Sequence, residues 1–294
     1  MKRKHHLIPL ILYYLIRSII GKKEPNFAHY NLKMIKIILK KLFCLDKSEV
    51  IVAYTSHNIR IAKSTRTVYS ILNGKYKNVH IVLTLYKEDT HYLTGEIKRL
   101  IDAGIIELII ADTDLGPHLK YFYVMQKYRD LPIITIDDDN IYYNDHVSIL
   151  MSYHQEYPNT IIARRCFMLE EENGTLVRYN DLLYEFSPLD YPSHRNFATG
   201  IGGILYPPNI LEISDEMIPE ILAMKYDDDV VLKVFEIRKG IKIYATNAKL
   251  HKYKPIKDED VVGIGLWVNG NKEKTHNNIM KYEKEFLWAA RDGK

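Results

Sequence analysis

Cysteine and long apolar runs are both scarce in this sequence. Its only cysteines, Cys44 and Cys166, are not at metal-ligand spacing, which favours two free thiols in a reducing compartment. The longest apolar run, Leu7 to Ile20, is interrupted by Pro9 and Arg17 and is shorter than the roughly 20 residues of a membrane span. It has no small-residue cleavage site and more lysines follow it, so the pattern also argues against an exported signal peptide.

Neither positive nor negative charge is in large excess over most of the chain. The formal net charge is only +4, and hydrophobic and charged residues make up 47% and 27%, as in ordinary soluble proteins. Outside the first 41 residues the aromatic and basic interleaving of a nucleic-acid reader is absent, so we expect no nucleic-acid partner. Near the N-terminus a local excess of basic residues could attract acidic lipid head groups; it comprises Lys2, Arg3, Lys4, Arg17, Lys22, Lys23, Lys33, Lys36, Lys40 and Lys41.

Residues 1–48 are predicted to form a basic helical extension. Between Asn31 and Leu45, apolar residues recur among lysines at near-helical spacing (Leu32, Ile35, Ile38, Leu42). This pattern suits an interfacial helix on an anionic membrane. It suits a helix packed on the main domain with a solvated lysine face equally well, and the two interpretations stay open at this point.

From residue 50 the pattern becomes an alternation of short apolar runs and amphipathic stretches. The runs predict buried strands at Val50–Tyr54, Val79–Leu85, Ile106–Ala111 and Leu131–Ile136. The stretches between them predict helices at Ile61–Leu72, His91–Ala103 and His118–Tyr128. Such alternation implies right-handed crossovers and a mostly parallel sheet with helices on both faces. Because ligands bind at the carboxyl ends of such strands, the polar residues after each strand are the candidates for function.

The second half of the chain is less regular. A strand is predicted near Thr160–Ala163 and a helix at Thr275–Ala290. The segment Thr199–Gly203 is rich in glycine and permits close backbone approach, but no helix follows it as in a dinucleotide site. We therefore expect one domain over residues 49–268 and a C-terminal helix within residues 269–294.

The first acidic triplet, Asp137-Asp138-Asp139, directly follows the predicted strand that ends at Ile136. Three crowded carboxylates repel one another unless water or a cation compensates them. Mg²⁺ or Mn²⁺ binds one or two carboxylates together with phosphate oxygens, so an ion here could join the protein to a diphosphate. An isolated acidic triplet is usually a solvated turn, but the buried strand before this one favours the metal site.

The second acidic triplet, Asp227-Asp228-Asp229, opens a predicted helix from Val230 to Lys239. One interpretation is helix capping, which stabilises a carboxylate at a helix N-terminus but needs only one aspartate. The other is a general base that deprotonates an acceptor hydroxyl. The spacing alone does not decide between them.

Two basic residues lie after predicted strands, Arg60 after the first and Lys120 after the third. Both positions suit a phosphate or sugar contact, although position alone favours an ordinary surface side chain in each case.

Taken together, these segments resemble bacterial glycosyltransferases of the GT-A fold, close to family 2 and typical of capsule or lipopolysaccharide loci. The resemblance covers about residues 50 to 245. Five segments carry it, in the family's order: Tyr54-Thr55-Ser56 to Arg60, Leu115-Gly116-Pro117 to Lys120, Ile133 to Asp139, Gly200 to Pro208, and Asp228 to Leu232 with Gly240.

The resemblance implies roles for both triplets. Asp137 and Asp139 would form the DxD pair that holds the nucleotide ribose and the metal, and Asp138 would face the donor sugar. Asp229 would be the general base, and Asp228 its neighbour.

The resemblance also implies contacts outside the triplets. Thr55, Ser56 and Arg60 fall where the first loop holds the nucleotide, and Lys120 where a basic residue supports the donor. His251 is a candidate third metal ligand from its position alone. The chain departs from the pattern at Val231, where relatives commonly carry Trp, and at His57, where they carry Pro; these departures bear on donor or acceptor preference.

The resemblance thus predicts a metal-dependent hexosyltransferase that uses Mn²⁺ or Mg²⁺, inverts the anomeric centre and builds surface polysaccharide. Its partners would be a nucleotide-sugar donor, a saccharide or lipid-linked saccharide acceptor, and an anionic membrane surface. The expected location is the cytoplasm, peripheral on the inner face of the membrane. The alternatives are a metal-dependent phosphohydrolase and a membrane-attached GT-A module that has lost activity.

Overall fold

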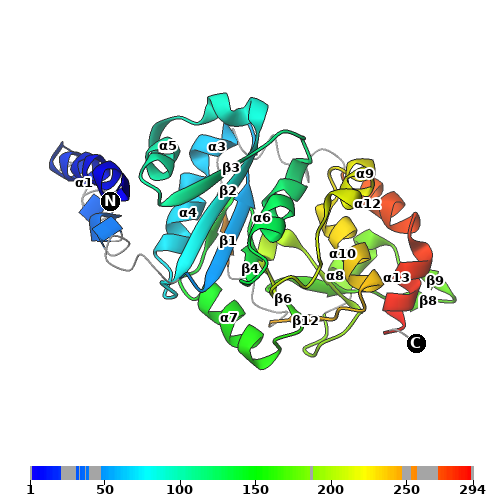
Figure 1. Ribbon diagram of the computed structural model, residues 1–294. Helices are drawn as coiled ribbons and strands as arrows, with labels where there is room; N and C mark the ends of the chain where they lie inside the picture. Colours follow the sequence, from blue (N-terminus) through cyan, green and yellow to red (C-terminus); the bar gives the residue numbers. More distant parts are fainter. Residues whose placement is uncertain are drawn as a thin grey trace.

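The computed structural model describes residues 2–20, 31–32, 34–36, 38–39, 48–185, 188–246, 253–256 and 271–292. A seven-stranded sheet lies at its centre with helices on both sides (Figure 1). The strand order is β12-β6-β11-β4-β1-β2-β3. The bounds are β1 (Val50–Thr55), β2 (Val79–Tyr86), β3 (Ile106–Ala111), β4 (Ile133–Thr135), β6 (Ile161–Ala163), β11 (Ile204–Tyr206) and β12 (Ile243–Ala245).

The sheet is mostly parallel. β1 pairs in parallel with both β2 and β4, β2 with β3, and β6 with β12, whereas β11 is antiparallel to both β4 and β6. The predicted α/β fold with a mostly parallel central sheet and flanking helices is therefore confirmed. The five predicted strands up to Thr160–Ala163 lie within one or two residues of their observed bounds.

Alternate residues of each strand enter separate cores on the two faces of the sheet. In β1, Val50, Val52 and Tyr54 join the core beneath the helices of one face, while Ile51 and Ala53 join the other. On the first face lie α1 (Lys2–Ile20), α3 (Arg60–Lys63), α4 (Thr65–Leu72), α5 (Gly95–Asp102) and α7 (His146–Glu156). On the second lie α6 (Phe122–Lys127), α9 (Ile218–Ala223), α10 (Asp228–Arg238), α12 (Asn271–Met280) and α13 (Glu283–Ala290).

Shorter elements complete the chain. The 3-10 turns are η1 (Lys87–Tyr92), η2 (Gly116–Lys120), η3 (Gly200–Gly202) and η4 (Asp215–Met217), and one further helix is α8 (Tyr179–Glu185). The small strands are β5 (Asn140–Tyr142), β7 (Cys166–Met168), β8 (Glu171–Glu172), β9 (Thr175–Leu176), β10 (Asn196–Ala198) and β13 (Tyr253–Pro255). These pair as β10 with β7, β13 with β5, and β8 with β9.

Several predicted helices are broken in the structure. The segment predicted at 61–72 is two helices that meet at Ser64, whose hydroxyl donates to the carbonyl of Ile61 (2.8 Å). The segment predicted at 118–128 begins as the 3-10 turn η2, and the C-terminal stretch is two helices, α12 and α13. Phe286 of α13 is fully buried in the core that α10 shares.

The N-terminal segment packs on α5 through one face of α1. The Tyr14 hydroxyl donates to Glu96 (2.7 Å), and Arg17 pairs with the same carboxylate at 3.3 Å. Residues 31–32, 34–36 and 38–39 are helical, and their buried side chains include Ile35 and Ile38. Among the residues described, no helix is both long enough and apolar enough to cross a bilayer.

Candidate active site

The first acidic triplet lies at the carboxyl end of β4, and a basic partner holds each of its carboxylates. Asp137 is 2.9 Å from the Lys120 ammonium. Asp138 receives Nε of Arg60 at 3.1 Å, a second guanidinium hydrogen bond and the Ser56 hydroxyl. Asp139 is 3.1 Å from the same guanidinium. From the sequence we expected water or a metal cation to compensate these carboxylates; in the structure Arg60 and Lys120 already compensate part of their charge.

Asp138 is buried, and both of its carboxylate oxygens accept hydrogen bonds from Arg60. Its predicted contact with the donor sugar stays a prediction. Its carbonyl also accepts the Thr67 hydroxyl at 2.8 Å. The contacts of Asp138 therefore fasten the end of β4 to the loop after β1 and to α4.

The first loop contributes to the site through the same contacts. The hydroxyl of Thr55 donates to the carbonyl of Thr84 (2.8 Å) and so ties β1 to β2. Ser56 and Arg60 are both buried against Asp138. The structure thus places the three predicted donor-binding residues of the first loop at the carboxyl end of the sheet, but the hydrogen bonds of their side chains go to the protein. Their contacts with a nucleotide stay a prediction.

The second acidic triplet lies at the start of α10, and its three side chains have three different partners. Asp227 accepts the Thr275 hydroxyl at 2.5 Å and the Asn278 amide, which fastens α12 to α10. Asp228 is 2.7 Å from the Lys120 ammonium. Asp229 accepts the backbone N–H of Gly200 at 2.9 Å. The Asp227 side chain makes no capping hydrogen bond to α10, so a side-chain cap does not explain this residue.

Lys120 joins the two triplets. Its side chain is only 6% exposed and reaches Asp137 and Asp228 from η2, so it is not the surface lysine of the alternative interpretation. Burial alone would lower the pKa of Lys120, but the surrounding carboxylates raise it well above its ordinary value and keep the ammonium charged.

Gly200 makes this close arrangement sterically feasible. A Cβ at this position would lie 2.7 Å from the Lys120 ammonium, 3.3 Å from Asp229 Oδ1 and 3.5 Å from Asp137 Oδ1. The glycine-rich segment therefore serves the close approach expected of it, and the structure identifies the neighbours as the two acidic clusters.

The two aspartates beside Lys120 have opposite protonation behaviour. Burial would raise the pKa of Asp228, but the Lys120 charge outweighs it and leaves that pKa below its ordinary value. Burial and the ionised Asp228 together raise the pKa of Asp229 to about 8. One carboxylate is thus held ionised while its neighbour exchanges a proton near neutral pH, as is common at acid–base sites.

The charge balance of the site leaves room for a cation. Among the residues described, four carboxylates (Asp137, Asp138, Asp139 and Asp228) meet two cationic side chains, Arg60 and Lys120, while Asp229, with a pKa of about 8, is mostly protonated at neutral pH. Burial, Asp137 and Asp138 raise the pKa of Asp139 to about 6, which shows that its negative charge is incompletely compensated. Asp137 and Asp139 remain 30% and 36% exposed, so their oxygens can reach a bound ion.

The residues described hold no group of three or more His, Cys, Asp or Glu side chains arranged for a metal ion. Two exposed carboxylates fit the kind of Mg²⁺ or Mn²⁺ site in which phosphate oxygens and water complete the coordination. His251, the predicted third ligand, lies outside the described residues. The metal site at Asp137 and Asp139 thus stays a prediction with which the donor set is compatible.

Two residues near the site were missed from the sequence. Tyr142 of β5 accepts the backbone N–H of Asp137 at its hydroxyl (3.0 Å). Arg165 is the second residue after β6 and donates to the Thr199 hydroxyl (2.6 Å), next to the glycine-rich segment. In the described part of the chain no carboxylate lies within ion-pair distance of Arg165. The rule that polar residues after strands are candidates would have found Arg165, because it follows the predicted strand at 160–163.

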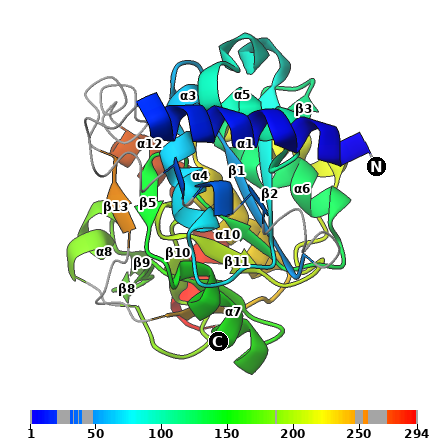
Figure 2. The same ribbon diagram turned by 90° about the vertical axis from the view of Figure 1, so that its left-hand side faces the viewer.

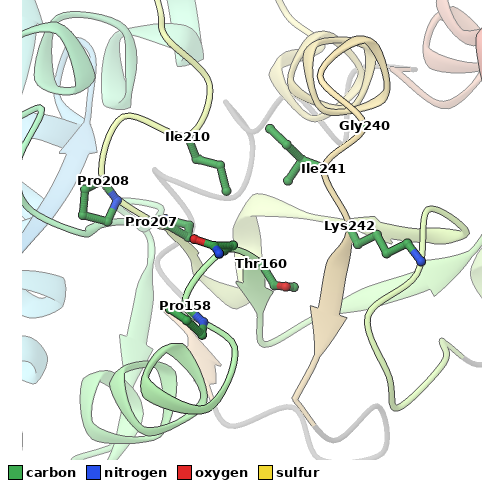
Figure 3. Close-up of a pocket in the computed structure, with 9 residues that line it drawn as sticks. Pro158, Thr160, Pro207, Pro208, Ile210, Gly240, Ile241 and Lys242 are labelled. Atoms are coloured by element: carbon green, nitrogen blue, oxygen red, sulfur yellow. The ribbon is translucent and has the colours of Figure 1, made fainter.

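A hollow of about 600 Å³ lies at the opposite edge of the sheet (Figure 3). Its lining includes Thr160 and Lys242, which come just before β6 and β12, and Pro207, which follows the antiparallel β11. Its lining contains no carboxylate or histidine, so it lacks the acid–base groups that lie at the carboxyl ends of the strands.

No protein-family model matches this sequence, and no curated protein sequence matches it. Among solved structures it is similar to S. aureus TarS 1-349 in complex with UDP-GlcNAc, with 12% identity and a TM-score of 0.48 over 83% of this chain and 67% of that one. Another structure of S. aureus TarS 1-349 has 11% identity and a TM-score of 0.47 over 83% of this chain and 70% of that one. The TarS 1-349 complex with UDP has 10% identity and a TM-score of 0.43 over 70% of this chain and 59% of that one. The chain spans 36% of a longer TarS chain.

Proposed function

We propose that this chain is a glycosyltransferase that moves a sugar from a nucleotide-sugar donor to an acceptor hydroxyl. One observation carries the proposal. At the carboxyl edge of the sheet, buried Lys120 joins Asp137, on the side expected for the donor, to Asp228, whose neighbour Asp229 has a pKa of about 8. An anion-rich edge that can take a cation and a diphosphate thus lies beside a group that can accept a proton.

In this mechanism the residues of the chain have separate tasks. Asp229 accepts the proton of the acceptor hydroxyl, the acceptor oxygen bonds to the anomeric carbon, and the bond from that carbon to the diphosphate oxygen breaks with its electron pair on the leaving group. Lys120 keeps Asp228 ionised, and that charge keeps Asp229 basic enough to accept the proton. A divalent cation bound at Asp137 and Asp139 would supply charge neutralisation for the departing diphosphate.

The proposal includes inversion at the anomeric carbon. A double displacement needs a second, ionised carboxylate as nucleophile, and the ionised neighbour here, Asp228, is buried against Lys120. A single displacement needs only the proton acceptor that Asp229 provides. Proton NMR of the product tests this step, because a retained anomeric configuration would contradict it.

The acceptor and the biological setting rest on the resemblance of the sequence alone. We propose a saccharide or lipid-linked saccharide acceptor and a role in surface polysaccharide synthesis, of the capsule or lipopolysaccharide type, with hexosyl transfer as the reaction. The loosely structured second half of the domain is where we expect the acceptor to bind.

The test is a ligand screen on the full chain. UDP-, GDP- and CMP-sugars are compared by thermal shift with and without Mn²⁺, since a ligand that binds only the folded state raises its apparent stability. Stabilisation by a nucleoside diphosphate sugar that exceeds stabilisation by Mn²⁺ alone supports the proposal. Turnover of simple phosphomonoesters without nucleotide-sugar binding would instead support the phosphohydrolase, and binding of neither metal nor nucleotide would support an inactive module.

A further inference from the structure

The outer face of α1 carries apolar side chains that no described part of the chain covers. Four of them are between 40% and 64% exposed and recur at the spacing of one helical face: Ile8, Leu12, Leu15 and Ile16. The opposite face of the same helix is buried in the core through Leu7, Leu10 and Tyr14. The helix is therefore apolar on both sides, and only one side is covered by residues that the structure describes.

The next helical stretch continues this exposed surface. Leu32, Lys36 and Leu39 are exposed and lie on one helical face at intervals of four and three residues. In both views these short helical pieces lie beside α1, outside α4 (Figures 1 and 2). We call the six exposed apolar residues the apolar stripe: Ile8, Leu12, Leu15, Ile16, Leu32 and Leu39. They are six of the thirteen exposed large hydrophobic residues in the described part of the chain, which is a concentration typical of an interaction surface.

The charge of this segment indicates the kind of partner. Residues 1–48 contain eleven lysines and arginines but only two acidic residues, Glu24 and Asp46. Residues 49–294 contain more acidic than basic residues, so the positive charge of the protein comes from the segment that bears the stripe. Lys36 lies between two residues of the stripe, and α1 begins with three basic residues at positions 2–4.

We propose that α1 and the helical residues 31–32, 34–36 and 38–39 form a docking surface for an anionic lipid bilayer, with these helical segments lying in the plane of the interface. Apolar side chains that enter the acyl boundary and cations that meet acidic head groups are the two attractions that hold an interfacial helix. A second copy of the chain fits this surface less well, because stacking two stripes would bring two strongly basic segments together. The proposal does not depend on the sugar-transfer chemistry.

Co-sedimentation of the full chain with vesicles tests the proposal. The vesicles are phosphatidylcholine with about one third phosphatidylglycerol, and pure phosphatidylcholine vesicles and added salt serve as comparisons. The stripe variant is Leu12→Glu with Ile16→Glu, at positions 54% and 45% exposed. Its matched control is Ile110→Glu with Leu222→Glu, at 56% and 44%. We expect the stripe variant to lose at least about tenfold in partitioning and the control to bind like the wild type.

The outcomes are distinguishable. Wild-type binding that weakens on neutral vesicles and in salt, and that the stripe variant loses, supports the proposal. Absence of wild-type binding, or equal binding by the two variants, overturns it. Sedimentation velocity without lipid covers the rival occupant, since a dimer that the stripe substitutions disperse, without vesicle binding, would assign the surface to a second copy. Circular dichroism of both variants confirms that any loss is not unfolding.

Discussion

Replacing Lys120 by Met removes the buried charge that joins the two acidic clusters while keeping most of the side-chain volume. The ammonium is 2.9 Å from Asp137 and 2.7 Å from Asp228, and the side chain is almost fully buried. Breaking a buried ion pair by removing one partner costs about 3–5 kcal/mol, because the remaining charge is left without compensation. We expect Lys120→Met to lose stability in this range near pH 8.

The loss should depend on pH in a defined direction. In the wild type the pKa of Asp228 lies below its ordinary value, so the ion pair stabilises the fold above that ordinary value and the contribution is lost as the pH falls through the folded pKa. Without Lys120, burial raises the pKa of Asp228, and the carboxyl group can take up a proton instead of remaining charged. The difference in unfolding free energy between wild type and variant should therefore shrink between pH 8 and pH 5.

Urea unfolding followed by circular dichroism at both pH values measures this difference. Lys98→Met is the matched control, because Lys98 forms an exposed pair with Asp102 on α5 and should cost less than about 0.5 kcal/mol. A cost below about 1 kcal/mol for Lys120→Met, or an equal cost at the two pH values, would refute the reasoning.

Three further predictions concern the walls of the site. Gly200→Ala should lower transfer activity strongly, because the added Cβ would push against Lys120 and Asp229. At the control position Gly104 a Cβ meets nothing within 4 Å, so Gly104→Ala should keep activity and lose about 1–2 kcal/mol of stability to backbone strain. Initial rates and urea unfolding of both variants check this. Asp139→Asn should fold normally yet lose the stimulation by Mn²⁺ that we expect of the wild type, and His251→Ala should weaken it if that histidine is a ligand; metal titrations of activity decide both. Asp227→Ala should lower the free energy of unfolding by about 1–3 kcal/mol, because the Thr275 hydroxyl stays buried without its acceptor. Asp215 is exposed, so Asp215→Ala should leave that free energy nearly unchanged. Equal losses in urea unfolding would count against the contact between α10 and α12.

The sequence predicted the sheet well because strands buried on both faces are continuous apolar runs, as at Val79–Tyr86. It predicted the helix ends poorly, because helical periodicity continues through a local break such as the one at Ser64. Within the site, the two acidic triplets could be recognised from the sequence, because the first follows a predicted strand and the second precedes a predicted helix.

The pairing within the site could not be read from the chain, because it depends on side chains that are far apart in sequence. Lys120 reaches an aspartate 108 positions later, and Arg60 reaches one 78 positions later. Spacing indicated that the crowded carboxylates need compensation, but not that lysine and arginine side chains supply part of it. For the same reason the ionised Asp228 and the protonated Asp229 could not be told apart before their distances to Lys120 were known.

The role of Asp229 is the central claim, and the pH dependence of transfer tests it most directly. With a pKa of about 8, Asp229 is mostly protonated at pH 7 in the free protein, so kcat/KM for acceptor-dependent release of nucleoside diphosphate should rise with pH, reach half its maximum near pH 8 and level off only above that pH. Asp229→Asn should bind the donor, fall at least about 100-fold in kcat/KM and lose this rising limb. An Asp229→Asn variant that keeps both the rate and the rising limb would contradict the account.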